Sequence, residues 1–124
     1  MQALNYRTLE YSKSRVQFGV PIASFQALQH RMVEMFMIAE QTRSLLLHAV
    51  MAQDEDDRNA AKASIHALKV QVGTEGRRLG EEAVQLHGGM GVSWELDVAH
   101  YFKRLTMIDT LFGNADHHLE AYPI

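Results

Sequence analysis

The chain has 124 residues, of which 47% are hydrophobic and 22% are charged, and it contains no cysteine. This composition is typical of one globular domain and excludes disordered and fibrous chains. Twelve Lys and Arg residues against fifteen Asp and Glu residues give a net charge of -3, so the chain lacks the basic surplus needed to bind a nucleic-acid backbone. The absence of cysteine excludes disulfides, thiolate nucleophiles and thiolate metal sites.

The sequence contains no stretch resembling a membrane span or a signal peptide. No run approaches the roughly 18 consecutive apolar residues that a span requires. Polar Gln2, Asn5 and Arg7 stand where a signal peptide would have its apolar core. We therefore expect a cytoplasmic protein with no membrane partner.

The first half of the chain predicts two helices separated by a turn. Apolar residues at three- and four-residue spacings predict an amphipathic helix over residues 2–16. Gly19 and Pro21 interrupt this pattern, so the segment QFGVPI is predicted to be a turn. A long helix is predicted from Ser24, acting as its N-cap, to about Ala52. The apolar side chains expected on its buried face are Leu28, Met32, Met35, Phe36, Ala39, Leu46 and Val50. Met37 and Met51 are also assigned to the core, because methionine at helical spacing usually fills irregular core space.

A third helix is predicted from about Ala60 to His87, after an acidic cluster over residues 54–59. Its apolar face consists of Ile65, Leu68, Val72, Leu79 and Leu86. Gly73, Gly76 and Gly80 lie inside this helix, where each costs about 1 kcal/mol relative to alanine. Close approach of neighbouring helices is the simplest compensation, and we expect it here.

The last third predicts two more helices. The segment HGGMG (87–91) ends the third helix, and a fourth is predicted from Glu95 to Phe112. A short terminal helix follows from Asn114. No convincing strand pattern or internal repeat is present. The sequence therefore predicts an all-α protein, an antiparallel four-helix bundle that forms a single domain over residues 1–124.

Four segments stand out by their order and separation. They are SRVQFGVPI (14–22), FQALQH (25–30), AVQLHGGMG (83–91) and YFKRLTMIDTLFGNADHHL (101–119). Together they resemble the C-terminal helical bundle of the flavin-dependent acyl-CoA dehydrogenases, over nearly the whole chain. The last segment is most similar to the small subunits of pimeloyl-CoA dehydrogenase and related heteromeric enzymes.

The resemblance implies one third of an enzyme. Complete members of the family carry an N-terminal helical domain and a middle β-domain before this bundle, and we expect both to be absent from this chain. The expected function is that of a C-terminal domain in an oxidoreductase that uses FAD to dehydrogenate acyl-CoA thioesters, in fatty acid or steroid catabolism. The chain alone is expected to be inactive and, in isolation, free of FAD.

The resemblance also assigns candidate FAD-contact residues. Arg15, Gln17 and Phe18 match positions that reach the FAD of a neighbouring subunit. As a forked cation at the mouth of a turn, Arg15 suits a phosphate or pyrophosphate group, although an arginine at a helix end is more often part of a surface ion pair. Phe18 could cover an adenine or flavin edge, although a lone aromatic residue is usually part of the core.

Two further groups complete the expected cofactor site. Gln85, Gly88 and Gly89 match positions used against the adenosine-pyrophosphate part of FAD, while an ordinary glycine C-cap is the alternative. Asn114 and Asp116 lie at the start of the last helix, where free amides suit an anion. Asn114 alternatively serves only as an N-cap. The carboxylate of Asp116 would repel a phosphate unless it points away or accepts a hydrogen bond from a ribose.

The family's reaction needs a carboxylate to remove the acyl α-proton. In many relatives a glutamate immediately precedes the glycine equivalent to Gly113, but here Phe112 occupies that position. The family's alternative base lies upstream of this sequence. Asp109, three residues before Phe112, is the nearest carboxylate that could substitute, although single acidic residues on helices are usually solvated. We therefore expect no catalytic residue in this chain.

No metal site is predicted. His117 and His118 point about 100° apart on a helix and cannot chelate one ion from one face. Expected partners are further copies of the chain or another acyl-CoA dehydrogenase subunit, with acyl-CoA bound only in the complete enzyme. The alternative function is a noncatalytic helical interaction module that binds no flavin.

Overall fold

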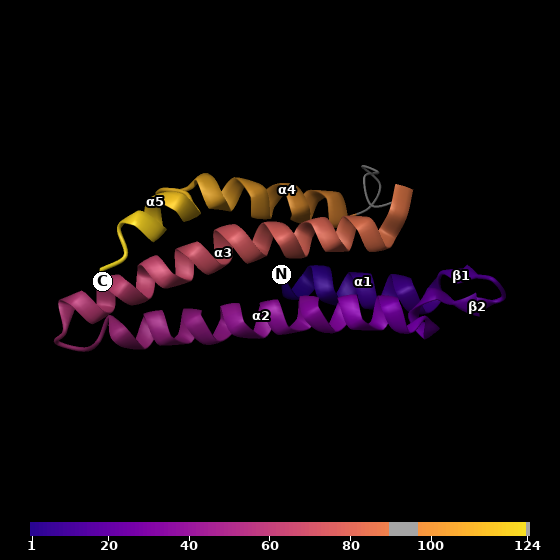
Figure 1. The fold of residues 1–124 in the computed structure, drawn as a ribbon, viewed down its shortest axis with the longest axis horizontal. Coiled ribbons are helices and arrows are strands. Elements are labelled where there is room, and N and C mark those ends of the chain that lie inside the picture. The colour runs from indigo at the N-terminus through magenta and orange to yellow at the C-terminus, as the bar shows by residue number, and fades with distance from the viewer. Residues whose placement is uncertain (90–96, 124) are drawn as a thin grey trace.

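A computed structural model describes residues 1–89 and 97–123 of the chain. In chain order the elements are α1 (Gln2–Ser14), β1 (Val16–Gln17), β2 (Val20–Pro21), the one-turn 3-10 helix η1 (Ile22–Ser24), α2 (Gln26–Ala52), α3 (Arg58–His87), α4 (Asp97–Thr110) and α5 (Ala115–Glu120). Figure 1 shows an elongated bundle with the β1–β2 hairpin at one end and the α2–α3 turn at the other. The predicted all-α fold is confirmed.

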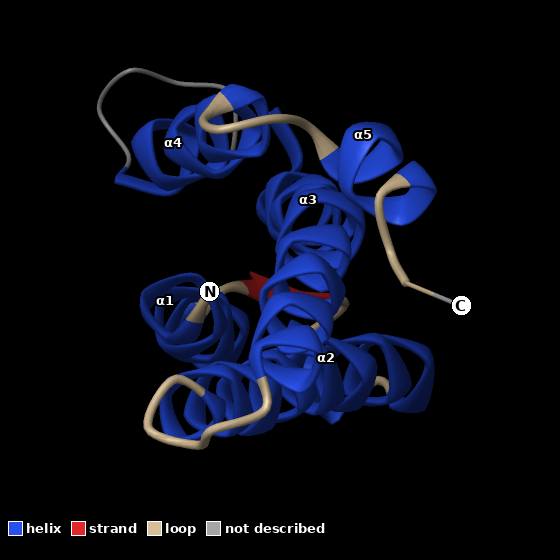
Figure 2. Ribbon diagram, turned by 90° about the vertical axis from the view of Figure 1, so that its left-hand side faces the viewer, coloured by secondary structure: helices blue, strands red, loops and turns tan. Residues whose placement is uncertain are grey.

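Helix α3 is the centre of the molecule. Figure 2 shows α1 and α2 on one side of it and α4 and α5 on the other. The buried core follows this arrangement, because it draws side chains from all four long helices. Its members are Leu4, Met35, Ile38, Ala39, Leu79, Ala83, Leu86, Val98 and Leu105.

Three glycines of α3 allow α4, α5 and the N-terminus to approach closely. A Cβ atom at Gly73 would collide with the Asp109 carboxylate and lie 2.9 Å from Ala115 Cβ. A Cβ at Gly80 would lie 2.5 Å from the Phe102 ring. The expectation that helix contacts compensate for these glycines is therefore confirmed.

The predicted turn around Gly19 is a tight two-residue hairpin. Val16 pairs with Pro21 and Gln17 with Val20 in antiparallel register. Phe18 and Gly19 connect the strands with φ angles of 54° and 79°, as a type I′ turn requires at both central positions. The first helix ends at Ser14 rather than at residue 16, because the backbone of Arg15 is already extended.

The N-caps of the helices show which of the predicted helix starts are right and which are wrong. Ser24 is not the N-cap of α2: its hydroxyl donates to the Pro21 carbonyl at 2.6 Å within η1, and α2 begins after Phe25. The acidic cluster does open α3, where an Asp57 carboxylate oxygen accepts from two backbone amides. Asn114 caps α5 by accepting from the His117 amide at 3.0 Å.

The predicted core of α2 is too large. Five of its apolar side chains are 49% to 66% exposed, and these are Phe36, Met37, Leu46, Val50 and Met51. Ile65 of the α3 face is also exposed. Figure 1 shows the cause in part, since α1 runs beside only one half of α2. Periodicity marks the apolar faces of a helix but does not say which of them the same chain covers.

Some predictions concern residues that the structure does not describe. The end of the HGGMG segment and the predicted start of the fourth helix at Glu95 lie among residues 90–96. In the described part of the chain, no helix combines the length and apolarity needed to cross a membrane.

Candidate functional site

A cleft of about 610 Å³ lies where α1, the hairpin and the ends of α2 and α3 meet. It brings together five residues that the sequence assigns to cofactor binding, namely Arg15, Gln17, Gln85, Gly88 and Gly89. Its other lining residues are Tyr11, Ile22, Leu28, Arg31, Leu86 and His87. The cleft thus combines residues that lie up to 78 positions apart in the chain.

Chain reversals place the two walls of this cleft. On one wall, the amide of Arg15 donates to the Tyr11 carbonyl, and its carbonyl accepts from the Ile22 amide, both at 2.8 Å. On the other, α3 stops at Gly88, whose φ of 61° a residue with a side chain rarely adopts. The predicted glycine C-cap is therefore present. Apart from their own chain neighbours, no atom of the described residues lies within 4 Å of the position of a Cβ at Gly88 or Gly89.

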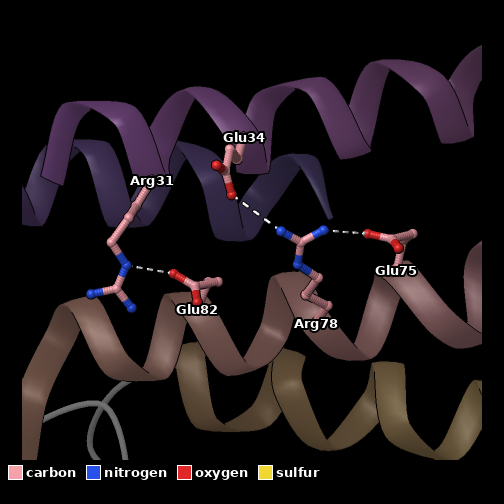
Figure 3. A network of polar contacts seen from close by, with 5 residues as sticks. All are labelled: Arg31, Glu34, Glu75, Arg78 and Glu82. Atoms are coloured by element: carbon pink, nitrogen blue, oxygen red, sulfur yellow. Dashed lines mark hydrogen bonds and ion pairs between the residues drawn. The ribbon is translucent and has the colours of Figure 1, made fainter. Parts of the chain in front are cut away.

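The charge of the cleft favours an anion. Its lining contains the guanidinium groups of Arg15 and Arg31 and no carboxylate, among the residues that the structure describes. Arg31 Nε contacts Glu82 Oε2 of α3 at 2.7 Å, as Figure 3 shows. This pair joins α2 to α3 beside the cleft and fixes the position of the Arg31 fork.

His87 forms the buried floor of the cleft. Its Nδ1 lies 2.8 Å from the Ala83 carbonyl and, since a carbonyl can only accept, Nδ1 carries the proton. The ring stacks on Tyr11 with centroids 4.4 Å apart. Desolvation by burial lowers the pKa of His87, opposed by the hydrogen bond to Ala83. The imidazole is therefore neutral near pH 7 and adds no positive charge to the cleft.

Phe18 lies outside the cleft lining. Its ring is 92% exposed at the tip of the hairpin and meets Phe25 edge-on, with centroids 6.3 Å apart. The usual core role of a lone aromatic residue is therefore wrong for Phe18. The side chain therefore projects from the molecule.

Asn114 caps α5 and Asp116 lies in its first turn, and Figure 1 shows α5 far along the bundle from the β1–β2 hairpin. They cannot contribute to the same cleft within one chain. The Asn114 side chain accepts from the His117 amide and so caps α5. Asp116 is exposed in the first turn of α5.

The residues considered for proton abstraction lie near α5. Phe112 is 91% exposed with a φ of 58°, and its carbonyl accepts from His118 Nε2 at 2.8 Å. The carboxylate of Asp109 accepts from the Ala115 amide at 3.0 Å and covers Gly73. Asp109 therefore has a structural role in holding the start of α5. Within residues 1–89 and 97–123, no group of three His, Asp or Glu side chains is placed to hold a metal ion.

Tyr11, Arg31 and His87 are cleft residues that the sequence analysis did not assign. Arg31 follows Leu28 by three positions, so both lie on one helical face, and this spacing is a signal that the sequence contains. Tyr11 and His87 carry no comparable signal. Their role comes from a stacking contact between residues 76 positions apart.

Comparison with known proteins gives a consistent result. Residues 1–121 match the family described as acyl-CoA dehydrogenase, C-terminal domain. The chain is 42% identical over 97 residues to acyl-CoA dehydrogenase IpdE2 of Mycobacterium tuberculosis, a match that covers 78% of this chain and 28% of that protein. The chain therefore spans less than one third of the length of this relative.

Solved structures share the fold. The FAD complex of PigA superimposes with a TM-score of 0.87 at 29% identity, over 96% of this chain and 30% of that one. The ChsE4-ChsE5 complex from Mycobacterium tuberculosis gives a TM-score of 0.89 at 28% identity, over 97% and 32% of the two chains. The chain belongs to the acyl-CoA dehydrogenase family, of which it forms a C-terminal helical domain.

Proposed function

We propose that this chain supplies part of the FAD site in an acyl-CoA dehydrogenase-type flavoprotein. The observation that carries the proposal is the cleft itself, which unites Arg15, Gln17, Gln85, Gly88 and Gly89. Relatives in complex with FAD, such as PigA, support the identity of the cofactor. The cleft would hold the adenosine and diphosphate part of that molecule.

The residues of the cleft fit such a group. Two guanidinium groups without a lining carboxylate offer hydrogen bonds and positive charge to a diphosphate. Gly88 and Gly89 carry no side chain that would obstruct a polar ligand, and no described atom beyond their chain neighbours lies within 4 Å of a Cβ position there. The stacked, neutral ring of His87 gives a rigid floor. The exposed hairpin with Phe18 is in a position to touch a second chain.

The bound flavin would accept the hydride of an acyl-CoA substrate, while a carboxylate takes the α-proton. This chain does not supply that carboxylate from residue 112, because a phenyl ring cannot accept a proton. Asp109 is engaged by the Ala115 amide. We therefore propose that the chain is inactive alone and acts beside another subunit or the domains found in its longer relatives.

A titration with ADP followed by amide NMR shifts tests the cleft. We expect shifts centred on Arg15, Gln17, Gly88 and Gly89, and about tenfold weaker binding for Arg15→Gln, since a charged hydrogen bond to phosphate is lost. Arg58→Gln is the matched control, because it removes the same charge at the far end of α3. FAD is titrated in parallel.

Two outcomes would contradict the proposal. If neither ADP nor FAD shifts the cleft amides at millimolar concentration, the chain is a helical interaction module that binds no flavin. If the purified chain with FAD and an electron acceptor oxidises an acyl thioester, the proposed lack of a base is wrong.

A further inference from the structure

Two arginines join α2 to α3, and they differ in what remains free. Arg78 contacts Glu34 through Nη2 at 3.1 Å and Glu75 through Nη1 at 3.4 Å. Its two terminal nitrogens are therefore both engaged by carboxylates, as Figure 3 shows. Arg78 therefore has a structural role, with each terminal nitrogen already in contact with a carboxylate.

Arg31 is held differently. Glu82 engages it at Nε, 2.7 Å from Oε2, and in Figure 3 the two terminal nitrogens point away from that carboxylate. The structure gives these two nitrogens no ion-pair partner among residues 1–89 and 97–123. A planar guanidinium fixed at Nε keeps its remaining donors in a defined direction.

The location of Arg31 makes its two terminal nitrogens available to a ligand in the cleft. Its side chain is about one third exposed and lines the same cleft as Arg15, from α2 rather than from the end of α1. Neutral groups make up the rest of the lining, including His87, whose pKa burial lowers. A ligand in the cleft thus meets guanidinium groups from two different elements, of which that of Arg31 is paired at Nε with Glu82.

We propose that Arg31 is a second phosphate-binding residue of the cleft, oriented by Glu82 so that its two terminal nitrogens bind the diphosphate of a bound dinucleotide. The inference rests on the proposed function, because it assumes that the cleft takes such a ligand. A diphosphate presents oxygens on two phosphorus atoms, so two forked cations can bind it at once. Arg31 therefore contributes to selection of a diphosphate over an uncharged nucleoside.

The test compares ADP and adenosine binding to the whole chain by amide NMR shifts. We expect Arg31→Gln to weaken ADP binding about tenfold and adenosine binding less than about twofold. Arg31→Lys retains the charge but lacks the forked guanidinium. We expect it to weaken ADP binding about threefold. Arg78→Gln is the matched control, since it also breaks an ion pair between α2 and α3. It should change ADP affinity by less than about twofold.

The outcomes separate this inference from the proposed function. If the unaltered chain binds no ADP, the proposed function fails. If that chain binds ADP but Arg31→Gln and Arg78→Gln behave alike, the inference about Arg31 fails and the cleft stands. If Arg31→Gln lost affinity for ADP and adenosine equally, the inference about Arg31 would also be overturned, because equal losses would indicate a change in cleft shape. Should Arg31→Gln fail to fold by circular dichroism, Arg31→Lys decides the question on the same ligand pair.

Discussion

At the residue scale, His87 links the stability of the bundle to the state of the cleft. Its Nδ1 hydrogen bond to Ala83 and its stacking on Tyr11 both use the neutral ring. Burial lowers its pKa because a charged imidazole would lose its hydration there. In the unfolded chain the same side chain is hydrated and binds a proton more readily.

This difference predicts a pH dependence of stability. Below about pH 6.5 the unfolded state takes up more protons than the folded state, so the free energy of unfolding falls as pH falls. His87→Asn keeps a donor near the Nδ1 position but cannot titrate in this range. The variant should lose about 1 kcal/mol at pH 7 from the lost stacking, yet show a shallower decline between pH 7 and 5. Urea denaturation at each pH measures both quantities.

Exposed His48 provides the control for that experiment. His48→Asn should leave the pH profile of the unfolding free energy close to that of the unaltered chain. A profile that His87→Asn leaves just as steep would refute the assignment of the acid sensitivity to the cleft floor.

Sequence reasoning identified some cleft residues and missed others for a physical reason. Arg15, Gln85 and Gly88 stand in local motifs, so their positions are visible in the sequence. Tyr11 and His87 become neighbours only when α1 packs beside the end of α3. No local pattern records such a contact, because it depends on how two helices pack.

At the element scale, α3 uses glycine to admit α4 and α5. Gly73 is the tightest position, since an added Cβ would collide with the Asp109 carboxylate. That carboxylate also accepts from the Ala115 amide at the start of α5. The close packing against α3 at Gly73 and the hydrogen bond at the start of α5 therefore both depend on the Asp109 carboxylate.

Gly73→Ala should destabilise the fold in spite of alanine's better helix propensity. The propensity gain is about 1 kcal/mol. Overpacking and displacement of Asp109 from its amide partner together cost about 2–4 kcal/mol, which leaves a net loss of about 1–3 kcal/mol. Urea denaturation followed by circular dichroism measures the change.

Gly76→Ala is the matched comparison on the same helix. Its added Cβ would meet the flexible end of Met1 at 2.9 Å and Leu105 Cδ2 at an ordinary 3.5 Å. Because Met1 can move aside, we expect a change within about 0.5 kcal/mol or a small gain in stability. If both substitutions had the same effect, the contact with Asp109 would not be the cause.

A histidine pair also attaches α5 to α3. His118 Nε2 lies 2.8 Å from the Phe112 carbonyl, and the facing Nδ1 atoms of His118 and His66 are 2.9 Å apart. Since a carbonyl only accepts, His118 uses Nε2 as donor, and in the neutral pair His66 donates to His118 Nδ1. The imidazoles therefore serve the docking of α5.

The sequence predicted the long helices well and some of their boundaries poorly. Uninterrupted periodicity identifies α2 and α3, and the acidic cluster over residues 54–59 marks the junction between them. Ser24 is predicted as the cap from its residue type, but its hydroxyl donates to the Pro21 carbonyl within a one-turn helix instead of accepting from an amide of α2. Phe25 is the actual N-cap of α2, and its side chain has no polar group that could cap a helix, so the sequence does not mark this start.

At the scale of the whole molecule, the chain exposes more surface than its mass predicts. Its accessible surface is 8179 Å², whereas a compact monomer of 14.1 kDa has about 6,700 Å². Part of the excess is apolar, since half of α2 is covered on one side only. The same fact explains the wrong core assignments at Leu46 and Val50: their apolar pattern is real, but this chain does not bury them.

The exposed apolar surface includes a groove of about 620 Å³ between α1 and α2. Its large apolar side chains are Tyr6, Leu9, Met32, Val33 and Phe36. Contiguous apolar surface of this kind favours association in water. A chain that covers less than one third of its relatives would, in their context, have further surface to pack against.

We therefore predict that the isolated chain self-associates at high micromolar concentration and that Phe36 contributes to it. Burying an exposed phenylalanine ring yields about 2 kcal/mol, so Phe36→Glu should raise the dissociation constant of the assembly by about 30-fold or more. The fold should survive, since this side chain is more than half exposed. Light scattering after size exclusion gives the mass across a dilution series. Phe112→Glu makes the same chemical change at the turn before α5 and should leave the assembly intact. A monomeric mass for the unaltered chain at every concentration would show that the exposed faces do not bind one another.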